Sequence, residues 1–254
     1  MGTAHAARAR VFVQFSWVLE LFALLGGTAR LLVRGQVSSR RTLDYIRAVG
    51  MESTPLLVFV ALPMSTLIIM GQGASSTSSH LLSSAAVGVF LHNIAPLVVT
   101  GIVLLRWPAA KSAEIGLDAV AEGWTARDLQ EGEILRTVVA PAVVGTSAGM
   151  VCLWGVHLLL IVIGGILATV VALGVPLLQL FVRIATSMSF WNLAAGFLFT
   201  AVCGAVVAAA TVQSGLEART LGDIPRAARH GQVRALIAAA LLGLIMTVAG
   251  GHWP

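Results

Sequence analysis

Long uncharged apolar stretches, separated by shorter charged ones, dominate the chain. Asp, Glu, Lys and Arg are absent from residues 53–105, 137–182, 184–216 and 235–254. A transmembrane helix needs about 20 apolar residues, so each of these windows is long enough to cross a bilayer. The pattern predicts an all-α integral membrane protein that forms a single domain over residues 1–254.

Five transmembrane helices fit these windows. The first window holds two of them, because the Gly and Ser run from Gly71 to His80 breaks the apolar pattern and suits a turn. The predicted spans are residues 53–72, 81–105, 137–163, 191–214 and 235–251.

The basic residues set the orientation, because Lys and Arg in short loops stay on the cytoplasmic side. They cluster before residue 48, within 106–136 and within 219–234. The window 137–182 is long enough for two short spans, or for one span followed by an outer segment through residues 174–190. One span keeps the last basic cluster inside and leaves only Arg183 outside, so we favour it. The N-terminus is then cytoplasmic and the C-terminus lies outside.

The N-terminal run has an apolar stripe. Phe12, Phe15, Leu19 and Phe22 follow one another at spacings of three and four, which places them on one face of a helix. Basic residues flank this run on both sides, which argues against a crossing. We therefore predict an amphipathic helix and a basic segment over residues 8–47 that lie in the cytoplasmic interface. A sixth span is the alternative.

Candidate chemistry within the chain is sparse. A lipid-modifying enzyme would need clustered Asp, Glu or His residues, and a secondary transporter would need ionisable residues within its spans. Neither pattern is present, and there is no GxxxxGK[ST] phosphate loop for ATP. Cys152, Cys203 and His157 stand alone in apolar windows, so we expect two small core residues and a hydrogen-bonded core histidine. The net charge of +5 fits inside loops near anionic lipid and indicates no nucleic acid.

One charged segment, residues 106–136, joins the second and third spans on the cytoplasmic side. Its part WPAAKSAEIGLDAVAEGW consists of good helix formers. Lys111, Glu114 and Asp118 lie at spacings of three and four, which predicts one charged stripe and a contact between Lys111 and Glu114. The segment is either a solvated loop helix or a handle for a cytoplasmic partner.

The sequence HNIAPLVVTGIVLLRWPAAKSAEIGLDAVAEG resembles the signature of the MlaE or YrbE permeases, the membrane subunits of MCE-associated ABC lipid transporters. The matching positions are Pro96, Arg106, Ala113, Glu114, Ile115, Gly116 and Glu122. Upstream, RAVGMESTPLLVFVALPMSTLIIMGQG is similar to the first span of that family. The family's Gly-Arg-x-Gly turn is replaced by LRWPAA, and the Gln of its Glu-Gln pair is Gly123. The chain resembles a divergent member, of the paired YrbE kind found in actinobacteria.

The resemblance implies a function and a set of partners. It implies a permease subunit in the cytoplasmic membrane that moves lipids or other hydrophobic molecules across or between membranes of the cell envelope. The implied partners are a cytoplasmic ATPase dimer that binds ATP and Mg, a second permease copy, identical or paralogous, and MCE proteins on the outer side. The chain itself would bind no cofactor and no metal.

The resemblance also implies two groups of site residues. Glu114, Gly116 and Glu122 would dock the ATPase, Glu114 and Glu122 through charge-assisted hydrogen bonds. The lipid pocket would be bordered by residues near the ends of the first two spans: Met64, Leu67, Ile68, Gln72, His92 and Asn93. Polar groups at membrane depth usually face a bundle interior or cavity. His92 and Asn93 are alternatively a satisfied structural pair.

Overall fold

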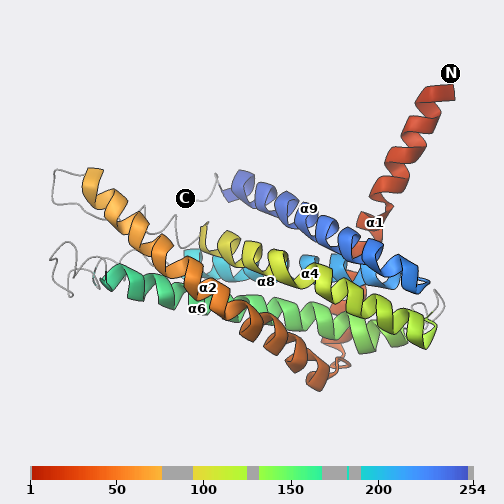
Figure 1. Cartoon of the computed structure of the whole chain (residues 1–254), viewed down its shortest axis with the longest axis horizontal. Helices are drawn as coiled ribbons and strands as arrows, with labels where there is room; N and C mark the ends of the chain where they lie inside the picture. Colours follow the sequence, from red (N-terminus) through yellow and green to blue (C-terminus); the bar gives the residue numbers. More distant parts are fainter. Residues whose placement is uncertain (1, 76–93, 125–131, 168–181, 183–189, 251–254) are drawn as a thin grey trace. The chain divides into compact units, whose positions relative to one another are not determined.

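Every secondary-structure element in the described part of the chain is helical. The structure is a computed structural model, and it describes residues 2–75, 94–124, 132–167, 182 and 190–250 (Figure 1). The elements in chain order are α1 (Gly2–Val33), α2 (Ser39–Ser75), α4 (Ala95–Glu122), the π-helix η2 (Leu135–Val139), α6 (Ala140–Leu167), α8 (Phe190–Leu216), the 3-10 helix η4 (Leu221–Asp223) and α9 (Ile224–Gly250). The all-α class predicted from the sequence is confirmed for these residues.

The chain divides into two compact units. Unit 1 consists of Met1–Tyr45, Trp107–Thr146 and Ala205–Ala239, and unit 2 consists of Ile46–Arg106, Ser147–Gly204 and Ala240–Pro254. Among the residues that the structure describes, the charged residues of unit 2 are Arg47, Glu52 and Arg106. The remaining described acidic and basic residues belong to unit 1, so the two units differ sharply in polarity.

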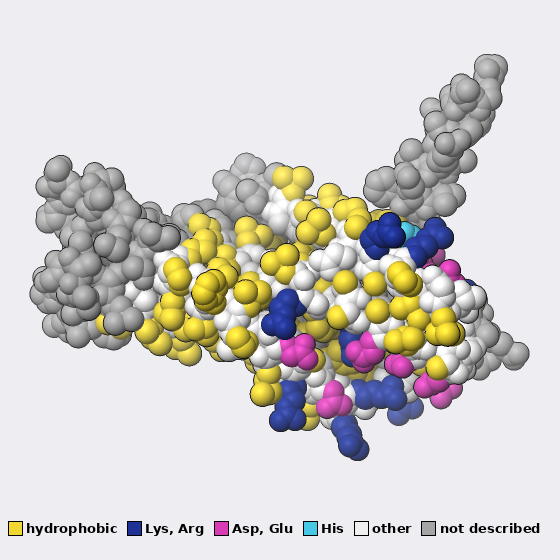
Figure 2. Space-filling view, viewed as in Figure 1, with side chains coloured by type: hydrophobic (Ala, Val, Ile, Leu, Met, Phe, Trp, Pro, Cys, Tyr) yellow, Lys and Arg dark blue, Asp and Glu magenta, His cyan; other side chains and the backbone are white. Residues whose placement is uncertain are grey.

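Unit 2 has the surface of a membrane protein. Large apolar side chains are exposed on it, among them Phe59 (77%), Leu159 (64%) and Phe197 (51%). Figure 2 shows broad areas of hydrophobic side chains on the face drawn. Exposed apolar area of this extent is unfavourable in water and favourable in lipid.

Close helix packing within unit 2 depends on small residues. A methyl group at Gly149 of α6 would lie 3.0 Å from Cβ of Val49 on α2, and one at Gly196 of α8 would lie 2.9 Å from the Trp154 ring on α6. Glycine at these positions therefore lets the helices approach, as in other membrane bundles. Two buried threonines of this unit form hydrogen bonds within their own helices: Thr100 Oγ1 donates to the Pro96 carbonyl at 2.8 Å, and Thr200 Oγ1 donates to the Gly196 carbonyl at 2.7 Å.

Three helices in the described part of the chain are long and apolar enough to cross a bilayer. They cover Ser39–Met64, Leu135–Gly164 and Leu193–Leu216. They correspond to the predicted spans 53–72, 137–163 and 191–214. The span 81–105 lies partly outside the described residues, and residues 235–250 of the last predicted span are helical within α9. The full arrangement of five spans stays a prediction.

Several helices continue beyond the predicted spans. The Gly and Ser run was expected to turn from Gly71, yet α2 remains helical to Ser75. Helix α9 begins at Ile224, well before residue 235, and α4 passes Arg106 without a break. The physical reason is that hydropathy reports the surroundings of a helix, whereas the backbone hydrogen bonds that define a helix continue through a change of surroundings. The outer segment 174–190 lies almost wholly outside the described residues.

Helix α1 ends in a Schellman motif. Gly35 has a φ of +65°, which favours glycine, and Gln36 N donates to the Leu31 carbonyl at 3.0 Å. The described part of the predicted apolar stripe is exposed, with Leu19 at 67% and Phe22 at 65%. Such a face suits contact with lipid, and the interfacial position of α1 stays a prediction.

Candidate functional site

The first part of the charged segment predicted from the sequence forms the second half of α4. Residues Trp107–Glu122 belong to unit 1 and form a helix with two different sides. Ser112, Ile115 and Ala119 are buried at 0%, 2% and 4% exposure. The helix ends where Gly123 adopts a φ of +66° and Trp124 N donates to the Ala119 carbonyl at 3.0 Å. This part of the charged segment is therefore helical, as predicted, but it is continuous with the preceding apolar helix.

Three carboxylates define an acidic face on this segment. Glu114, Asp118 and Glu122 are exposed and follow one another at four-residue spacing. The predicted contact is confirmed, since Lys111 Nζ lies 2.5 Å from Glu114 Oε1. The docking residues inferred from the resemblance include Glu114 and Glu122 but omit Asp118, although the same spacing could have revealed it.

Asp118 lies in the middle of this acidic face. Partial burial and the negative charges of Glu114 and Glu122 raise the pKa of Asp118 above its ordinary value. Like charges at this spacing destabilise a helix by a few tenths of a kcal/mol. A positively charged group placed against the acidic face would relieve this repulsion and is therefore favoured there.

The end of α4 is fixed to the residues that follow α8. Trp124 Nε1 donates to Glu122 Oε2 at 2.7 Å, and Arg219 Nη1 donates to the Trp124 carbonyl at 3.1 Å. Lys111 lies 4.8 Å above the ring of Tyr45 at the start of α2. These contacts hold the acidic face in one orientation within unit 1.

Gly116 lies on the opposite side from the acidic face. A methyl group there would lie 3.2 Å from Cβ of Ala218 and 3.4 Å from the carbonyl oxygen of Gly215. The close approach at Gly116 is therefore to the end of α8 in the same chain. Whether Gly116 also contributes to docking a partner stays a prediction.

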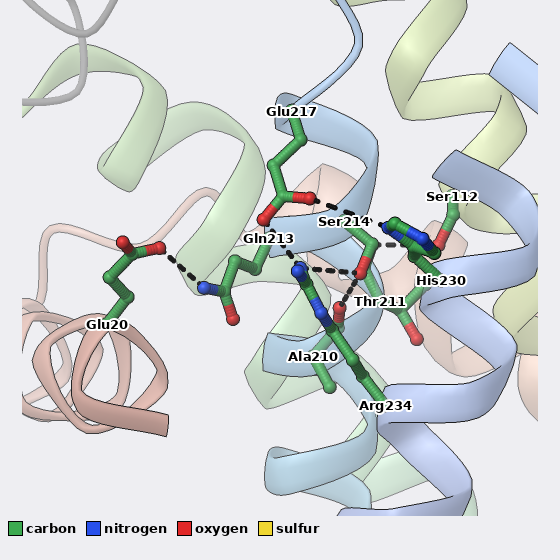
Figure 3. Close-up of polar contacts among 9 residues, drawn as sticks. All are labelled: Glu20, Ser112, Ala210, Thr211, Gln213, Ser214, Glu217, His230 and Arg234. Atoms are coloured by element: carbon green, nitrogen blue, oxygen red, sulfur yellow. Dashed lines mark hydrogen bonds and ion pairs between the residues drawn. The ribbon is translucent and has the colours of Figure 1, made fainter. Parts of the chain in front are cut away.

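Three helices of unit 1 meet around Ser112. Ser112 Oγ on α4 donates to the Thr211 carbonyl on α8 at 2.8 Å (Figure 3). A methyl group at Gly215 of α8 would lie 2.8 Å from Cβ of Ile115, and a methyl group at Gly231 of α9 would overlap Ser112 Oγ. We call Ser112, Thr211, Gly215 and Gly231 the α4–α8–α9 junction. Glycine is required at positions 215 and 231 because the neighbouring helix occupies the space that a side chain would need.

A polar cluster lies beside this junction. Arg234 Nη1 on α9 lies 2.6 Å from Glu217 Oε1 and donates to Ser214 Oγ on α8 at 3.3 Å. Figure 3 shows these side chains directed toward one another. The guanidinium of Arg234 also lies 5.8 Å from the centre of the Trp17 ring on α1. Arg234 therefore contacts two other helices of unit 1.

Helix α1 is also attached to α8. Gln213 Nε2 donates to Glu20 Oε2 at 2.6 Å (Figure 3). Sequence reasoning missed this contact, because the two residues are far apart in the chain. The available signal was weak: Gln213 and Ser214 are polar residues at the end of an otherwise apolar window.

His230 lies next to the cluster, with Nδ1 4.0 Å from Glu217 Oε2. Burial, together with the positive charges of Arg234 and Arg226, holds the pKa of His230 below its ordinary value. The neutral imidazole is therefore favoured at this position, and Arg234 is the cation in direct contact with Glu217.

The predicted lipid-binding residues are described only in part. Met64 is half-buried on α2. Leu67, Ile68 and Gln72 belong to the same helix, but their side chains lie outside the described residues, and so do His92 and Asn93. At spacings of three and four, Met64, Leu67 and Ile68 share one face of α2. Their role in lipid binding stays a prediction.

The isolated polar residues of the apolar windows differ from expectation in two respects. His157 is fully buried, as expected, but neither ring nitrogen has a hydrogen-bond partner among the described residues, so the hydrogen bond expected for it is not found there. Cys203 is buried, whereas Cys152 is exposed and is not a core residue within this chain. An exposed thiol is compatible with an apolar helix face in lipid.

Apolar helices that suit a bilayer, together with charges gathered in a separate unit, define a multi-pass α-helical membrane protein. The family model for Permease MlaE matches residues 42–249. The chain therefore belongs to the MlaE permease family, which makes it an ABC-type permease subunit for lipid transport in the inner membrane and not a catalytic enzyme. A search of curated proteins finds no match.

Proposed function

We propose that this chain is the membrane subunit of an ATP-driven, MCE-type transporter that moves lipids across or between the membranes of the cell envelope. A cytoplasmic ATPase dimer binds ATP and Mg and hydrolyses the nucleotide. A second permease copy and outer MCE proteins complete the assembly. The observation that carries this proposal is the exposed acidic face of α4, which is joined on its opposite side to α8 and α9.

The acidic face is the docking surface for the ATPase. Carboxylates form their strongest hydrogen bonds with Arg and Lys, so the complementary surface is a basic groove on the ATPase. Leu117, which is 47% exposed between Glu114 and Asp118, adds an apolar contact. Docking through Glu114, Asp118 and Glu122 leaves the buried side of α4 in contact with its own chain.

Movement passes from the acidic face through the α4–α8–α9 junction. Ser112 is hydrogen-bonded to α8 and packed against Gly231 of α9, so a displacement of α4 displaces both neighbours. Tightly packed interfaces transmit such shifts because they do not deform continuously. Closure of the ATPase dimer then acts on the helices that border the lipid path.

The lipid path runs along the ends of the first two spans. Met64, Leu67, Ile68 and Gln72 border it on α2, and His92 and Asn93 border it within the second predicted span. The apolar residues accept acyl chains, and the polar residues accept the headgroup. The partner permease supplies the other side of the pocket.

Copurification tests the proposed assembly. Purified alone in detergent, the chain should neither bind nor hydrolyse ATP, since it has no phosphate loop. Isolated from its own membranes, it should bring with it an ATPase, a permease copy and MCE proteins, identified by mass spectrometry. Lipid transport that stops with the proton gradient and not with ATP would contradict the proposal.

Accessibility labelling tests the orientation. In a chain with Cys152 and Cys203 replaced by Ala, Leu221→Cys should react with an impermeant maleimide only after permeabilisation. Leu221 suits the test because it is 68% exposed and lies outside the acidic face. Ser78→Cys should react from outside. Labelling of Leu221→Cys in intact cells would reverse the proposed orientation.

A further inference from the structure

A half-open pocket lies where the turn between α1 and α2 meets the start of η2. Its volume is about 820 Å³, and all of its lining residues belong to unit 1. This volume is in the range of small-molecule sites, about 300 to 1,000 Å³. We call it the turn pocket. It contains none of the residues assigned above to docking or to the lipid path.

Two hydrogen bonds join the walls of the turn pocket. Arg136 Nε donates to the Gln36 carbonyl at 3.2 Å, and Arg41 Nη1 donates to the Thr137 carbonyl at 2.6 Å. Each bond joins the α1–α2 turn or the start of α2 to η2. The Schellman motif at Gly35 fixes the turn itself. The pocket is therefore built by specific contacts.

Two opposite charges line the turn pocket one helical turn apart. Arg136 and Glu133 are both exposed and both line it. The hydrogen bond from Arg136 Nε orients the guanidinium, and its terminal nitrogens have no partner among the described residues. The Glu133 carboxylate likewise forms no ion pair with any described residue. The pair suits a ligand that carries a negative and a positive group close together.

The surroundings of the turn pocket favour a lipid over a soluble molecule. Leu32 and Val33, at the end of α1, are 54% and 89% exposed, and Leu43 on α2 is 63% exposed. Exposed apolar residues of this size are expected at a surface that meets lipid. Leu31 and Val37 add apolar surface to the lining. An arginine in a pocket at the membrane interface suits the phosphate of a lipid headgroup.

We propose that the turn pocket binds a phospholipid headgroup in which an amine lies beside the phosphate, as in phosphatidylethanolamine. The terminal nitrogens of Arg136 donate to the phosphate, and Glu133 accepts from the ammonium. This lipid stays bound at the α1–α2 turn and is not the transported molecule. The free headgroup phosphoethanolamine shares the same chemistry and is the soluble alternative. The inference does not depend on the proposed ATPase partner.

Native mass spectrometry of the full chain in detergent tests this site. The protein is titrated separately with dioleoyl phosphatidylethanolamine, phosphatidylglycerol and phosphatidylcholine, and the bound lipid is counted. The wild type should retain phosphatidylethanolamine best. Arg136→Gln should weaken that binding about tenfold, because it removes a charged hydrogen bond to the phosphate. Glu133→Gln should remove the preference over phosphatidylglycerol.

The control is Arg226→Gln, which removes an exposed arginine of the same unit outside the turn pocket. It should bind lipid like the wild type. Equal binding of the three lipids by the wild type, or equal binding by wild type and Arg136→Gln, would overturn the proposal. Competition by phosphoethanolamine at the same concentration as the lipid would show that the ligand is the soluble molecule and would also overturn it. Circular dichroism of each variant separates loss of the site from loss of the fold.

Discussion

A chain carrying Glu114→Lys together with Glu122→Lys should reach the membrane in normal amount and lose its ATPase. The two substitutions reverse the charge at both ends of the acidic face, and the contacts they break, Glu114 with Lys111 and Glu122 with Trp124, are both exposed. Breaking a charged contact within an interface costs about 2 to 5 kcal/mol. The expected loss of affinity is about 25-fold or more. Pull-down of the ATPase and lipid transport in vesicles measure it.

The matched control for charge reversal is Asp44→Lys. Asp44 is an exposed carboxylate of unit 1 on α2, outside the acidic face. It should keep the ATPase and full transport. Asp223 is a poor control, because its carboxylate accepts hydrogen bonds from Thr220 N at 3.0 Å and Thr220 Oγ1 at 2.8 Å and so caps the turn. If the double mutant keeps the ATPase at normal stoichiometry and full transport, the acidic face is not a docking surface and this part of α4 is a solvated helix.

Gly231→Ala should destabilise unit 1, and Ser112→Gly in the same chain should restore part of the stability. The added methyl group overlaps Ser112 Oγ and lies 2.8 Å from Ser112 Cβ. Overpacking of this kind costs about 1 to 3 kcal/mol. Removal of the Ser112 side chain relieves the overlap and costs the hydrogen bond to Thr211, about 1 kcal/mol. Thermal unfolding in detergent of the two single variants and the double variant measures the coupling.

Gly26→Ala is the control for this series. Gly26 lies within α1, and a methyl group there would meet nothing within 4 Å. Alanine favours the helix over glycine, so this variant should be unchanged or slightly more stable. If Gly231→Ala is as stable as the wild type, or if Ser112→Gly gives no rescue, the three helices do not meet at Ser112 as described.

The sequence was informative where the interaction is local. The contact between Lys111 and Glu114 could be predicted because residues three apart are neighbours on any helix. The helical character of the charged segment followed from its composition in the same way. The acidic face could have been predicted in full, since Asp118 shares the spacing of Glu114 and Glu122.

The junction could not be predicted, because its partners are distant in the chain. Ser112 meets Thr211 across 99 positions, and no periodicity relates them. Gly116 illustrates the same limit, since no local pattern relates it to Ala218, whose Cβ would lie 3.2 Å from a methyl group at Gly116. The continuity of α4 was missed because hydropathy marks a change of solvent, which does not end a helix. The lipid-path residues apart from Met64 lie outside the described side chains.

The π-helix η2 has a consequence for the register of α6. Ala140 N donates to the Leu135 carbonyl, five residues back, so this turn contains one residue more than an α-turn. Deletion of Thr137 alone would convert η2 into a regular α-turn. Every later residue of α6 would then stay on the same face of the helix as before. The same surplus residue allows the segment before η2 to rotate by about 100°, one residue step of an α-helix, without unwinding α6. At η2, the segment that precedes α6 can therefore change its orientation while α6 itself stays an intact helix.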